Sequence, residues 1–173
     1  MHIAVSGNIG SGKTTLAIKL AKHYGWQAEL EAVENNPYLA DFYEDMKRWS
    51  FHLQVFFLNS RFNQIKRIRD GGLSVVQDRT IYEDAYIFAA NLYKSKLLTE
   101  RDYFNYRSLF DSMISHVKAP DLLIYLKADI PKLVGQIEKR GRSYETAMRI
   151  DYLKNLNSHY EEWIAGYKEG KLL

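Results

Sequence analysis

A glycine-rich stretch near the N-terminus follows the pattern G-x-x-x-x-G-K-[ST]: Gly7-Asn8-Ile9-Gly10-Ser11-Gly12-Lys13-Thr14. The apolar run Ile3-Ala4-Val5 precedes it and predicts a buried strand, and the apolar spacing that follows predicts an amphipathic helix ending at Gly25. Glycines in this setting allow backbone N–H groups to curl around phosphate oxygens, and the positive end of the helix dipole favours the same anion. The sequence therefore predicts a phosphate-binding loop between a strand and a helix.

Two residues of this loop have specific expected roles. The Lys13 ammonium should reach the β- and γ-phosphates of a nucleotide, and the Thr14 hydroxyl should bind Mg²⁺. The full set that we expect to contact phosphate in the loop is Gly7, Asn8, Ile9, Gly10, Ser11, Gly12, Lys13, Thr14 and Thr15.

Short apolar runs alternate with longer helical patterns over the whole chain. We expect strands at residues 3–5, 28–33, 73–77 and 122–126, and helices starting at 36–37 and covering 47–69, 82–97, 100–117, 130–139 and 144–168. This alternation predicts an α/β fold: a single domain over residues 1–173, with a parallel sheet and helices on both faces. Gly170-Lys171-Leu172-Leu173 looks like the start of another strand, and we expect a C-terminal strand and helix to be missing from this chain.

Composition excludes several classes of protein. The chain has no cysteine, which excludes disulfide scaffolds, cysteine-based zinc sites, iron–sulfur clusters and thiol nucleophiles. Its net charge of +3 is too small to argue for a nucleic acid polymer or an acidic membrane surface as a partner. No stretch approaches the roughly 20 apolar residues of a membrane helix, and no targeting segment begins the chain, so we expect a cytoplasmic protein.

A phosphate-binding loop does not by itself identify a reaction. The guanine-specific pattern N-K-x-D and the pattern D-x-x-G are both absent from the sequence, which disfavours a GTPase. A motor or a transporter ATPase usually needs a longer chain. A small-molecule kinase that uses ATP is the best remaining class.

Acidic residues follow two of the expected strands, at the edge of a parallel sheet where ligands bind. Glu31 lies in or just after strand 28–33, and Asp78 with Arg79 follows strand 73–77. One carboxylate there can help to hold Mg²⁺, another can accept a proton from an attacking hydroxyl, and an arginine can offset charge on a transferring phosphoryl group. The same residues would also fit a solvated strand-end carboxylate, in the case of Glu31, and a helix cap, in the case of Asp78.

Two further polar groups fit either a site or a solvated surface. Gln54 and Arg61 are seven residues apart on the expected long helix, which places them on one face about 10 Å apart along the axis. They could read the edge of a heterocycle, or they could form a solvated polar stripe. The basic run Lys139-Arg140-Gly141-Arg142 lies between two helices and reads equally well as a lid over phosphates (about residues 136–146) or as a solvated run.

These signals occur together in an order that resembles the deoxynucleoside kinase family over nearly the whole chain. Beyond the phosphate loop and Glu31, the resemblance is carried by Phe42-Tyr43-Glu44, Arg48-Trp49-Ser50-Phe51 with Gln54, Ser60-Arg61, Asp78-Arg79-Thr80 with Tyr82 and Asp84, Ile87-Phe88-Ala89, and Arg140-Gly141-Arg142 with Glu145. The segment Val33-Glu34-Asn35-Asn36-Pro37 is most similar to the bacterial kinases that act on purine deoxynucleosides.

The resemblance implies a role for each matching residue. Glu31 would be the base that faces the 5′-hydroxyl, Asp78 would help to hold Mg²⁺, and Arg79 would stabilise the transferring phosphoryl group. The other implied contacts are with the 3′-hydroxyl (Tyr43, Glu145), the base (Gln54, Arg61, Asp84), the pocket walls (Phe57, Phe88) and, from the lid, the phosphates of ATP (Arg140, Arg142). It also implies a homodimer with helices 47–69 and 82–97 across the interface.

The expected activity is ATP-dependent phosphorylation of the 5′-hydroxyl of a deoxyribonucleoside in nucleotide salvage. The resemblance implies that the relatives that accept thymidine have smaller or apolar residues at the positions of Arg61 and Asp84, which leave room for the 5-methyl group. Here the charged pair occupies that space, which favours a purine, either deoxyguanosine or deoxyadenosine. Deoxycytidine stays open as the main substrate. A nucleoside monophosphate kinase also stays open and so, in a different class, does a nucleotide-binding regulator without turnover.

Overall fold

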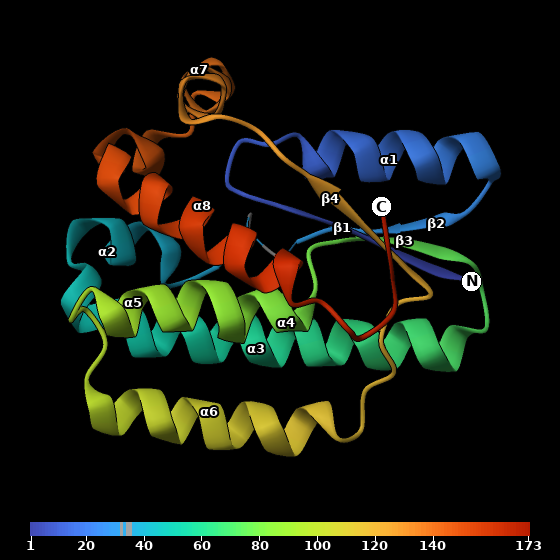
Figure 1. Cartoon of the computed structure of the whole chain (residues 1–173), viewed down its shortest axis with the longest axis horizontal. Coiled ribbons are helices and arrows are strands. Elements are labelled where there is room, and N and C mark those ends of the chain that lie inside the picture. Colours follow the sequence, from blue (N-terminus) through green and yellow to red (C-terminus); the bar gives the residue numbers. More distant parts are fainter. Residues whose placement is uncertain (32, 34–35) are drawn as a thin grey trace.

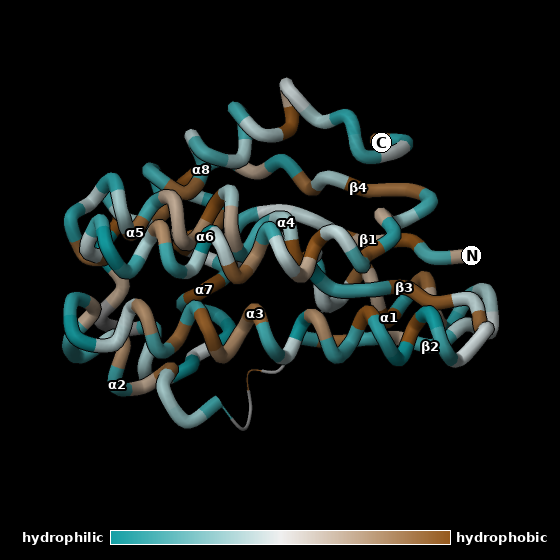
Figure 2. Tube along the Cα trace, turned by 90° about the horizontal axis from the view of Figure 1, so that it is seen from below, coloured by the Kyte–Doolittle hydropathy of each residue, from teal (hydrophilic) through white to brown (hydrophobic). Residues whose placement is uncertain are grey.

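The computed structural model describes residues 1–31, 33 and 36–173. Within these residues, five parallel strands form one sheet in the order β2-β3-β1-β4-β5. The strands are β1 (His2–Gly7), β2 (Gln27–Glu29), β3 (Val75–Asp78), β4 (Leu122–Leu126) and β5 (Lys171–Leu172). Strand β4 is apolar along most of its length, and β1 and β3 each contain an apolar run, residues 3–5 and 75–76 (Figure 2), as expected for strands that are covered on both faces.

Helices cover both faces of the sheet (Figure 1), which confirms the expected α/β fold. On one side lie α1 (Lys13–Tyr24) and α7 (Ile130–Arg140); on the other lie α2 (Leu39–Glu44), α3 (Met46–Gly71), α4 (Ile81–Glu83), α5 (Ala90–Lys94) and α8 (Ile150–Ala165). The remaining long helix, α6 (Glu100–Ile114), packs outside α3, where Tyr106 and Phe110 meet Leu58 in a fully buried cluster. None of the helices in the described residues is both long enough and apolar enough for a membrane crossing.

The second strand is shorter than the sequence predicts. We expected residues 28–33, but β2 ends at Glu29 because the carbonyl of Leu30 accepts a hydrogen bond from the Gln64 side chain at 3.0 Å instead of continuing the sheet. This early end leaves Glu31 beyond the strand, at the edge of the sheet. Of the Val33-Glu34-Asn35-Asn36-Pro37 match, residues 34 and 35 lie outside the described part of the chain.

Helix α2 begins later than the expected start at Asn36 and Pro37. Its first residue is Leu39, because the Asn36 side chain accepts a hydrogen bond from the backbone N–H of Tyr38 at 2.9 Å and forms a turn ahead of the helix. At the other end of the chain, Lys171 and Leu172 pair with β4 in parallel, so the strand that we expected to start near Gly170 is part of the sheet.

The helix expected over 82–97 contains an irregular turn. It consists of α4, a π-helical turn, η1 (Asp84–Ala89), and α5. A capping box starts it: the Glu83 side chain accepts from the backbone N–H of Thr80 at 2.7 Å. The π turn lies directly beside the sheet edge where Glu31 and Asp78 are found, and π turns often occur at functional sites.

A short 3₁₀ turn, η2 (Ser143–Ala147), precedes α8, so the last long helix starts at Ile150 and not at 144. Gly141 ends α7 in the left-handed conformation, with φ of 69°. The segment that we expected to be a lid therefore consists of the last turn of α7, a glycine turn and η2.

Candidate active site

The phosphate loop joins β1 to α1, as predicted. Gly10 has φ of +83°, and a Cβ atom there would come within 2.8 Å of the Leu133 carbonyl oxygen, so this position requires glycine for both conformation and space. Inside the loop, the Lys13 ammonium donates to the Asn8 carbonyl at 2.9 Å. Burial and the nearby Arg79 lower the pKa of Lys13 to about 8. A buried cation in this loop is suited to hold a polyphosphate.

Thr14 and Asp78 meet beside the loop. The Thr14 hydroxyl donates to Asp78 Oδ2, while Asp78 Oδ1 is buried and has no hydrogen-bond partner among the described residues. A hydroxyl and a carboxylate oxygen without a partner form a donor set that suits Mg²⁺, which binds proteins through one or two carboxylates and keeps most of its waters. No group of three or more His, Cys, Asp or Glu side chains in the described residues suits a metal ion.

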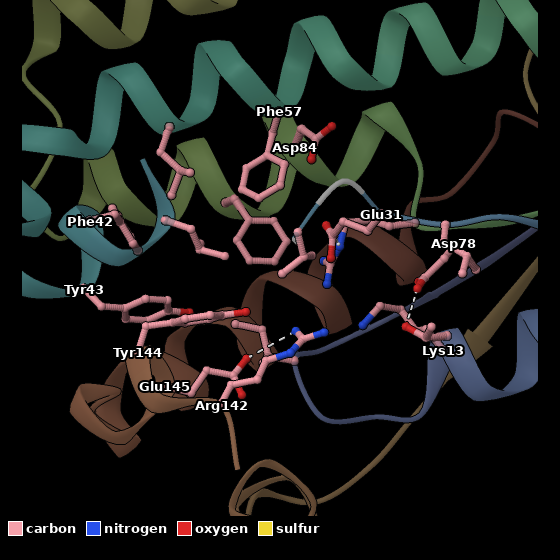
Figure 3. A pocket seen from close by; sticks show the side chains of 18 of the residues that line it. Lys13, Glu31, Phe42, Tyr43, Phe57, Asp78, Asp84, Arg142, Tyr144 and Glu145 are labelled. Atoms are coloured by element: carbon pink, nitrogen blue, oxygen red, sulfur yellow. Dashed lines mark hydrogen bonds and ion pairs between the residues drawn. The ribbon is translucent and has the colours of Figure 1, made fainter. Parts of the chain in front are cut away.

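A cavity of about 410 Å³ opens next to this pair (Figure 3). Its volume is in the range of small-molecule sites. The residues that line it come from the phosphate loop, the segment after β2, the end of β3, the helices α2, α3 and α8, the π turn and the lid: Ile9, Lys13, Thr14, Leu30, Glu31, Val33, Leu39, Phe42, Tyr43, Leu53, Gln54, Phe57, Asp78, Arg79, Asp84, Phe88, Arg140, Arg142, Tyr144, Glu145 and Tyr152. Every side chain that we expected to contact the acceptor lines this cavity, except Arg61.

Glu31 lies between two arginines at the centre of the cavity wall. Its Oε1 atom is 2.9 Å from Arg79 Nε and 3.1 Å from Arg61 Nη2. Burial alone would raise the pKa of Glu31, but Arg79, Arg61 and Lys13 outweigh it and lower the pKa to about 2. Glu31 is therefore a carboxylate at neutral pH, and its side chain keeps 21% of its surface exposed to the cavity.

Arg79 has a strained backbone and several buried partners. Its φ of 70° is unusual for a residue with a side chain. Its guanidinium stacks on the Phe88 ring at 4.5 Å, donates to the Tyr160 hydroxyl at 2.6 Å and lies 3.6 Å from Glu83. The surroundings fix the position of this cation beside Glu31.

Arg61 lies behind the cavity wall and is only 3% exposed. Its donors reach Asp84 Oδ2 at 3.4 Å, Glu31 Oε1 at 3.1 Å and the Asp78 carbonyl at 2.9 Å. The structure therefore places Arg61 as a support for Asp84 and Glu31 and not in the lining that an acceptor would touch. Asp84 itself lines the cavity, and burial raises its pKa to about 6 against the opposing effect of Arg61.

The end of the cavity next to Asp84 is mostly apolar with a few polar atoms. Phe57 and Phe88 form its walls, as expected. Gln54, two turns before Arg61 on α3, also lines it, and its Oε1 atom is buried without a hydrogen-bond partner in the described residues. An amide and a carboxylate that line a cavity together with two phenyl rings are suited to bind a flat heterocycle that carries hydrogen-bond donors.

Residues of α2 and of the lid form the opposite end of the cavity. The rings of Tyr43 and Tyr144 stack, with centroids 5.8 Å apart. Glu145 is buried and accepts from Arg140 Nε at 3.1 Å, with Arg142 Nη1 at 3.7 Å. Arg140 and Arg142 thus line the cavity from the lid and are about one-third exposed, which leaves them accessible to an anion. Figure 3 shows Arg142 beside Glu145.

Sequence reasoning missed several residues that complete the site. Tyr144 and Tyr152 line the cavity, and Glu83, Tyr160 and Gln64 support the residues that line it. Tyr152 and Tyr160 are eight residues apart on one face of α8, a helical spacing that could have indicated their shared direction. The spacing of Thr80 and Glu83 is that of a capping box and could have indicated their contact, but nothing in the sequence signals the contact of Glu83 with Tyr160 or the contacts of Gln64.

Comparison with known proteins agrees with this geometry. A family model described as "Deoxynucleoside kinase" matches residues 3–172. The chain is 44% identical over 167 residues to a deoxyadenosine/deoxycytidine kinase from Bacillus subtilis, covering 95% of this chain and 77% of that protein. It is 36% identical over 167 residues to a deoxyguanosine kinase from the same organism, covering 96% and 80%.

A solved structure has the same fold. The deoxyadenosine kinase from M. mycoides with bound dCMP and dCDP superposes with a TM-score of 0.92 at 30% sequence identity, covering 100% of this chain and 88% of that one. Together with the family match over nearly all residues and the phosphate loop beside a cavity of nucleoside size, this shows that the chain belongs to the deoxynucleoside kinase family, the phosphotransferases that act on deoxynucleosides.

Proposed function

We propose that this protein transfers the γ-phosphoryl group of ATP to the 5′-hydroxyl of a purine deoxyribonucleoside, as a step of nucleotide salvage. The observation that carries the proposal is the placement of Glu31 in contact with Arg79 and Arg61, on the wall of a cavity that also contains Lys13 and Asp84. One carboxylate thus lies in a cavity that offers both phosphate-binding and base-binding groups.

The donor side is formed by the phosphate loop and the lid. Lys13 would neutralise the β- and γ-phosphates, and Arg140 and Arg142 would approach them from the lid. Thr14 and Asp78 would hold Mg²⁺, which supplies charge neutralisation of the donor phosphates when bound. The orphaned oxygen of Asp78 supports this assignment, because a buried carboxylate oxygen without a partner is costly unless a cation is to meet it.

The chemical step needs a base and a cation close together. Glu31, ionised at neutral pH, would accept the proton of the 5′-hydroxyl as the oxygen bonds to the γ-phosphorus and the bond to ADP breaks. Arg79, 2.9 Å from Glu31 in the resting site, would stabilise the negative charge of the transferring group. Because phosphoryl transfer depends mostly on positioning and charge, the strained but tightly held Arg79 fits this role.

The base end favours an acceptor with an exocyclic amino group. The carboxylate of Asp84 and the amide oxygen of Gln54 can both accept hydrogen bonds, and Phe57 and Phe88 can stack on a ring system. These groups suit deoxyadenosine and deoxyguanosine. Deoxycytidine, which also carries an amino group, is the alternative, and the name of the B. subtilis relative includes it.

The sugar would lie near α2 and the lid. Tyr43 and Glu145, which both line the cavity, would bind the 3′-hydroxyl. A nucleoside monophosphate kinase would need cations for the acceptor phosphate in addition to the arginines that we assign to the donor. The side chains that we assign to the acceptor, Tyr43, Gln54, Asp84 and Glu145, are neutral or acidic. A non-catalytic regulator would have no use for Glu31 and Arg79 in contact.

The test is an ADP-release assay with Mg-ATP against deoxyadenosine, deoxyguanosine, deoxycytidine, thymidine and dTMP, with the Glu31→Gln variant in parallel. We expect turnover with a purine deoxynucleoside that the variant loses. Turnover with dTMP alone would contradict the proposal. Tight ATP binding without turnover on any acceptor would favour the regulator.

We also propose that the protein is a homodimer. Part of the apolar face of α3, which we expected across an interface, is covered by α6 within the same chain through Tyr106 and Phe110. The outer surface of α6 in turn exposes Phe104 (58%) and Leu109 (38%). Light scattering after size exclusion should give twice the mass of 20.2 kDa, and Phe104→Glu should reduce it to the monomer mass.

A further inference from the structure

Gln64 lies on α3, three residues after Arg61, and does not touch the cavity. Its side chain is 4% exposed, and its amide is bonded in three directions. Nε2 donates to the Leu30 carbonyl at 3.0 Å, and Oε1 accepts from Gln77 Nε2 at 3.0 Å and from Arg61 Nη1 at 3.2 Å. A buried amide that is satisfied by three different elements is expensive to build without a purpose, because each of these groups must give up water.

Each partner of Gln64 is next to a residue of the active site. Leu30 directly precedes Glu31, and Gln77 directly precedes Asp78. Arg61, the third partner, binds both the Glu31 carboxylate at 3.1 Å and the Asp78 carbonyl at 2.9 Å. One amide therefore contacts the residue before the candidate base, the residue before the candidate metal ligand and an arginine that donates to both of them.

Gln64 also explains where these residues lie. The hydrogen bond to the Leu30 carbonyl replaces the next bond of the sheet ladder, so β2 ends and the chain turns to bring Glu31 to the cavity. Gln77, on β3, is held from both sides, because its Oε1 is 2.8 Å from His2 Nε2 on β1. The hydrogen bonds of Gln64 to Leu30 and Gln77 therefore hold the ends of β2 and β3 against α3.

We propose that Gln64 is a positioning residue for phosphoryl transfer, which holds the segment of Glu31 and the segment of Asp78 in register through Leu30, Gln77 and Arg61. This inference rests on the proposed function, since it takes Glu31 as the base. It predicts an effect on the chemical step with little effect on binding, because Gln64 contacts neither the base end nor the phosphate loop. Catalytic groups displaced by a fraction of an ångström lose rate more than they lose affinity.

The substitution Gln64→Met keeps the length and shape of the side chain and removes all three hydrogen bonds. Gln64→Glu keeps an acceptor for Arg61 and Gln77 but places a carboxylate against the Leu30 carbonyl and competes with Glu31 for Arg61. The matched control is Asn63→Met, at the adjacent position on α3, where the side chain is exposed and its amide reaches only Asn59, at 3.4 Å.

We expect Gln64→Met and Gln64→Glu to lower kcat by about tenfold to a hundredfold, with the KM values for deoxynucleoside and ATP nearly unchanged. Asn63→Met should stay within about twofold of the wild-type kcat, as for most exposed substitutions. Steady-state kinetics with both substrates varied, together with the thermal midpoint of each variant, makes the measurement. The split between kcat and KM is the readout that a merely structural contribution would not produce.

The outcomes separate this inference from the proposed function. If Glu31→Gln keeps full turnover, the assignment of the base fails and the proposed function fails with it. If Glu31→Gln is inactive while either folded Gln64 variant keeps the wild-type kcat, the positioning role is overturned and the proposed function stands. The positioning role would also be overturned, in favour of a purely structural role, if both Gln64 variants failed to fold or if KM rose by as large a factor as kcat fell.

Discussion

The buried Tyr160 hydroxyl, on helix α8, accepts a hydrogen bond from Arg79 Nη1 at 2.6 Å. The two residues are 81 positions apart in the sequence. The same hydroxyl donates to Glu83 Oε1 at 2.9 Å. Arg79 has a left-handed backbone conformation that costs free energy. Such a conformation persists only where surrounding contacts hold the residue, and the hydrogen bond to Tyr160 is one of these contacts. Helix α8 thus fixes the cation that we assign to the transferring phosphoryl group.

The substitution Tyr160→Phe tests this arrangement. It leaves Arg79 and the buried Glu83 each short of one partner, and a lost hydrogen bond to a charged group costs about 1.5–3 kcal/mol. We expect kcat to fall by about tenfold and the free energy of unfolding to fall by about 1.5–3 kcal/mol. Kinetics and urea unfolding measure the two effects, with Tyr24→Phe, at an exposed position at the end of α1, as the control. Unchanged kcat in a folded Tyr160→Phe protein would exclude the role in holding Arg79.

The metal assignment predicts a shift in magnesium dependence. Asp78→Asn should raise the Mg²⁺ concentration needed for half-maximal turnover by more than about tenfold, because an amide is a weaker ligand than a carboxylate. Turnover measured against total Mg²⁺ at fixed ATP would show the shift. Asp70→Asn, at an exposed position with an exposed partner, Arg69, should leave the curve unchanged. Superimposable curves for Asp78→Asn and the wild type would remove Asp78 from the metal site.

Asp84 predicts a pH dependence of substrate binding. Its pKa of about 6 lies above the ordinary 3.8, so the carboxylate that accepts from the amino group of the base becomes protonated as pH falls through 6. We expect KM for the deoxynucleoside to rise between pH 7 and 5 in the wild type. In Asp84→Asn, KM should be higher at pH 7 and should lose this dependence. A pH-dependent KM in Asp84→Asn equal to that of the wild type would assign the effect to another group.

The raised pKa of Asp84 also makes the stability of the protein depend on pH. Its effect has the opposite sign to its effect on substrate binding, because protonation of Asp84 weakens binding but stabilises the folded protein. A carboxyl whose pKa is raised on folding binds protons more tightly in the native state, so its contribution to the free energy of unfolding falls as pH rises from about 4 to about 6. Replacing Asp84 by Asn should therefore remove this downward contribution from the stability curve in this window. Urea unfolding at pH 4, 5 and 6 provides the measurement, and an unchanged slope would contradict the shift.

The stacked pair Tyr43 and Tyr144 predicts that the lid contributes to acceptor binding. Aromatic pairs are worth about 0.5–1.5 kcal/mol beyond their buried area, so Tyr144→Ala should raise KM for the deoxynucleoside by about fivefold with a smaller change for ATP. Tyr144→Phe retains the ring and should show a smaller rise. Equal KM values for Tyr144→Ala and the wild type would mean that the pair has no part in binding.

Much of the fold followed from local patterns in the sequence. The phosphate loop, the strand over Leu122–Leu126 and the long helix ending at Gly71 and Gly72 have strong local signals, namely a fixed glycine motif, a continuous apolar run and a glycine pair. The strand ending at Asp78 was also located closely enough to place this residue and Arg79 at the sheet edge.

The rest depended on contacts that no local pattern encodes. The early end of β2 results from a side-chain hydrogen bond across 34 residues of sequence, between Gln64 and Leu30. The position of Arg61 behind the cavity depends on its hydrogen bonds to four acceptors, on Glu31, Gln64, Asp78 and Asp84, which spacing on a helix does not show. Tyr160 and Glu83 meet across 77 residues, so neither could be assigned to the site before the fold was known.

The π turn at Asp84–Ala89 has a consequence for how substrate choice can change in this protein. A π turn contains about one residue more than an α turn, so a single deletion within it can return the segment to regular helix without breaking the chain's path. Such a deletion would rotate Asp84 relative to Phe88 and would redraw the base end of the cavity without replacing either side chain. Chain length in these six residues is therefore a variable of substrate selection in its own right, alongside residue identity.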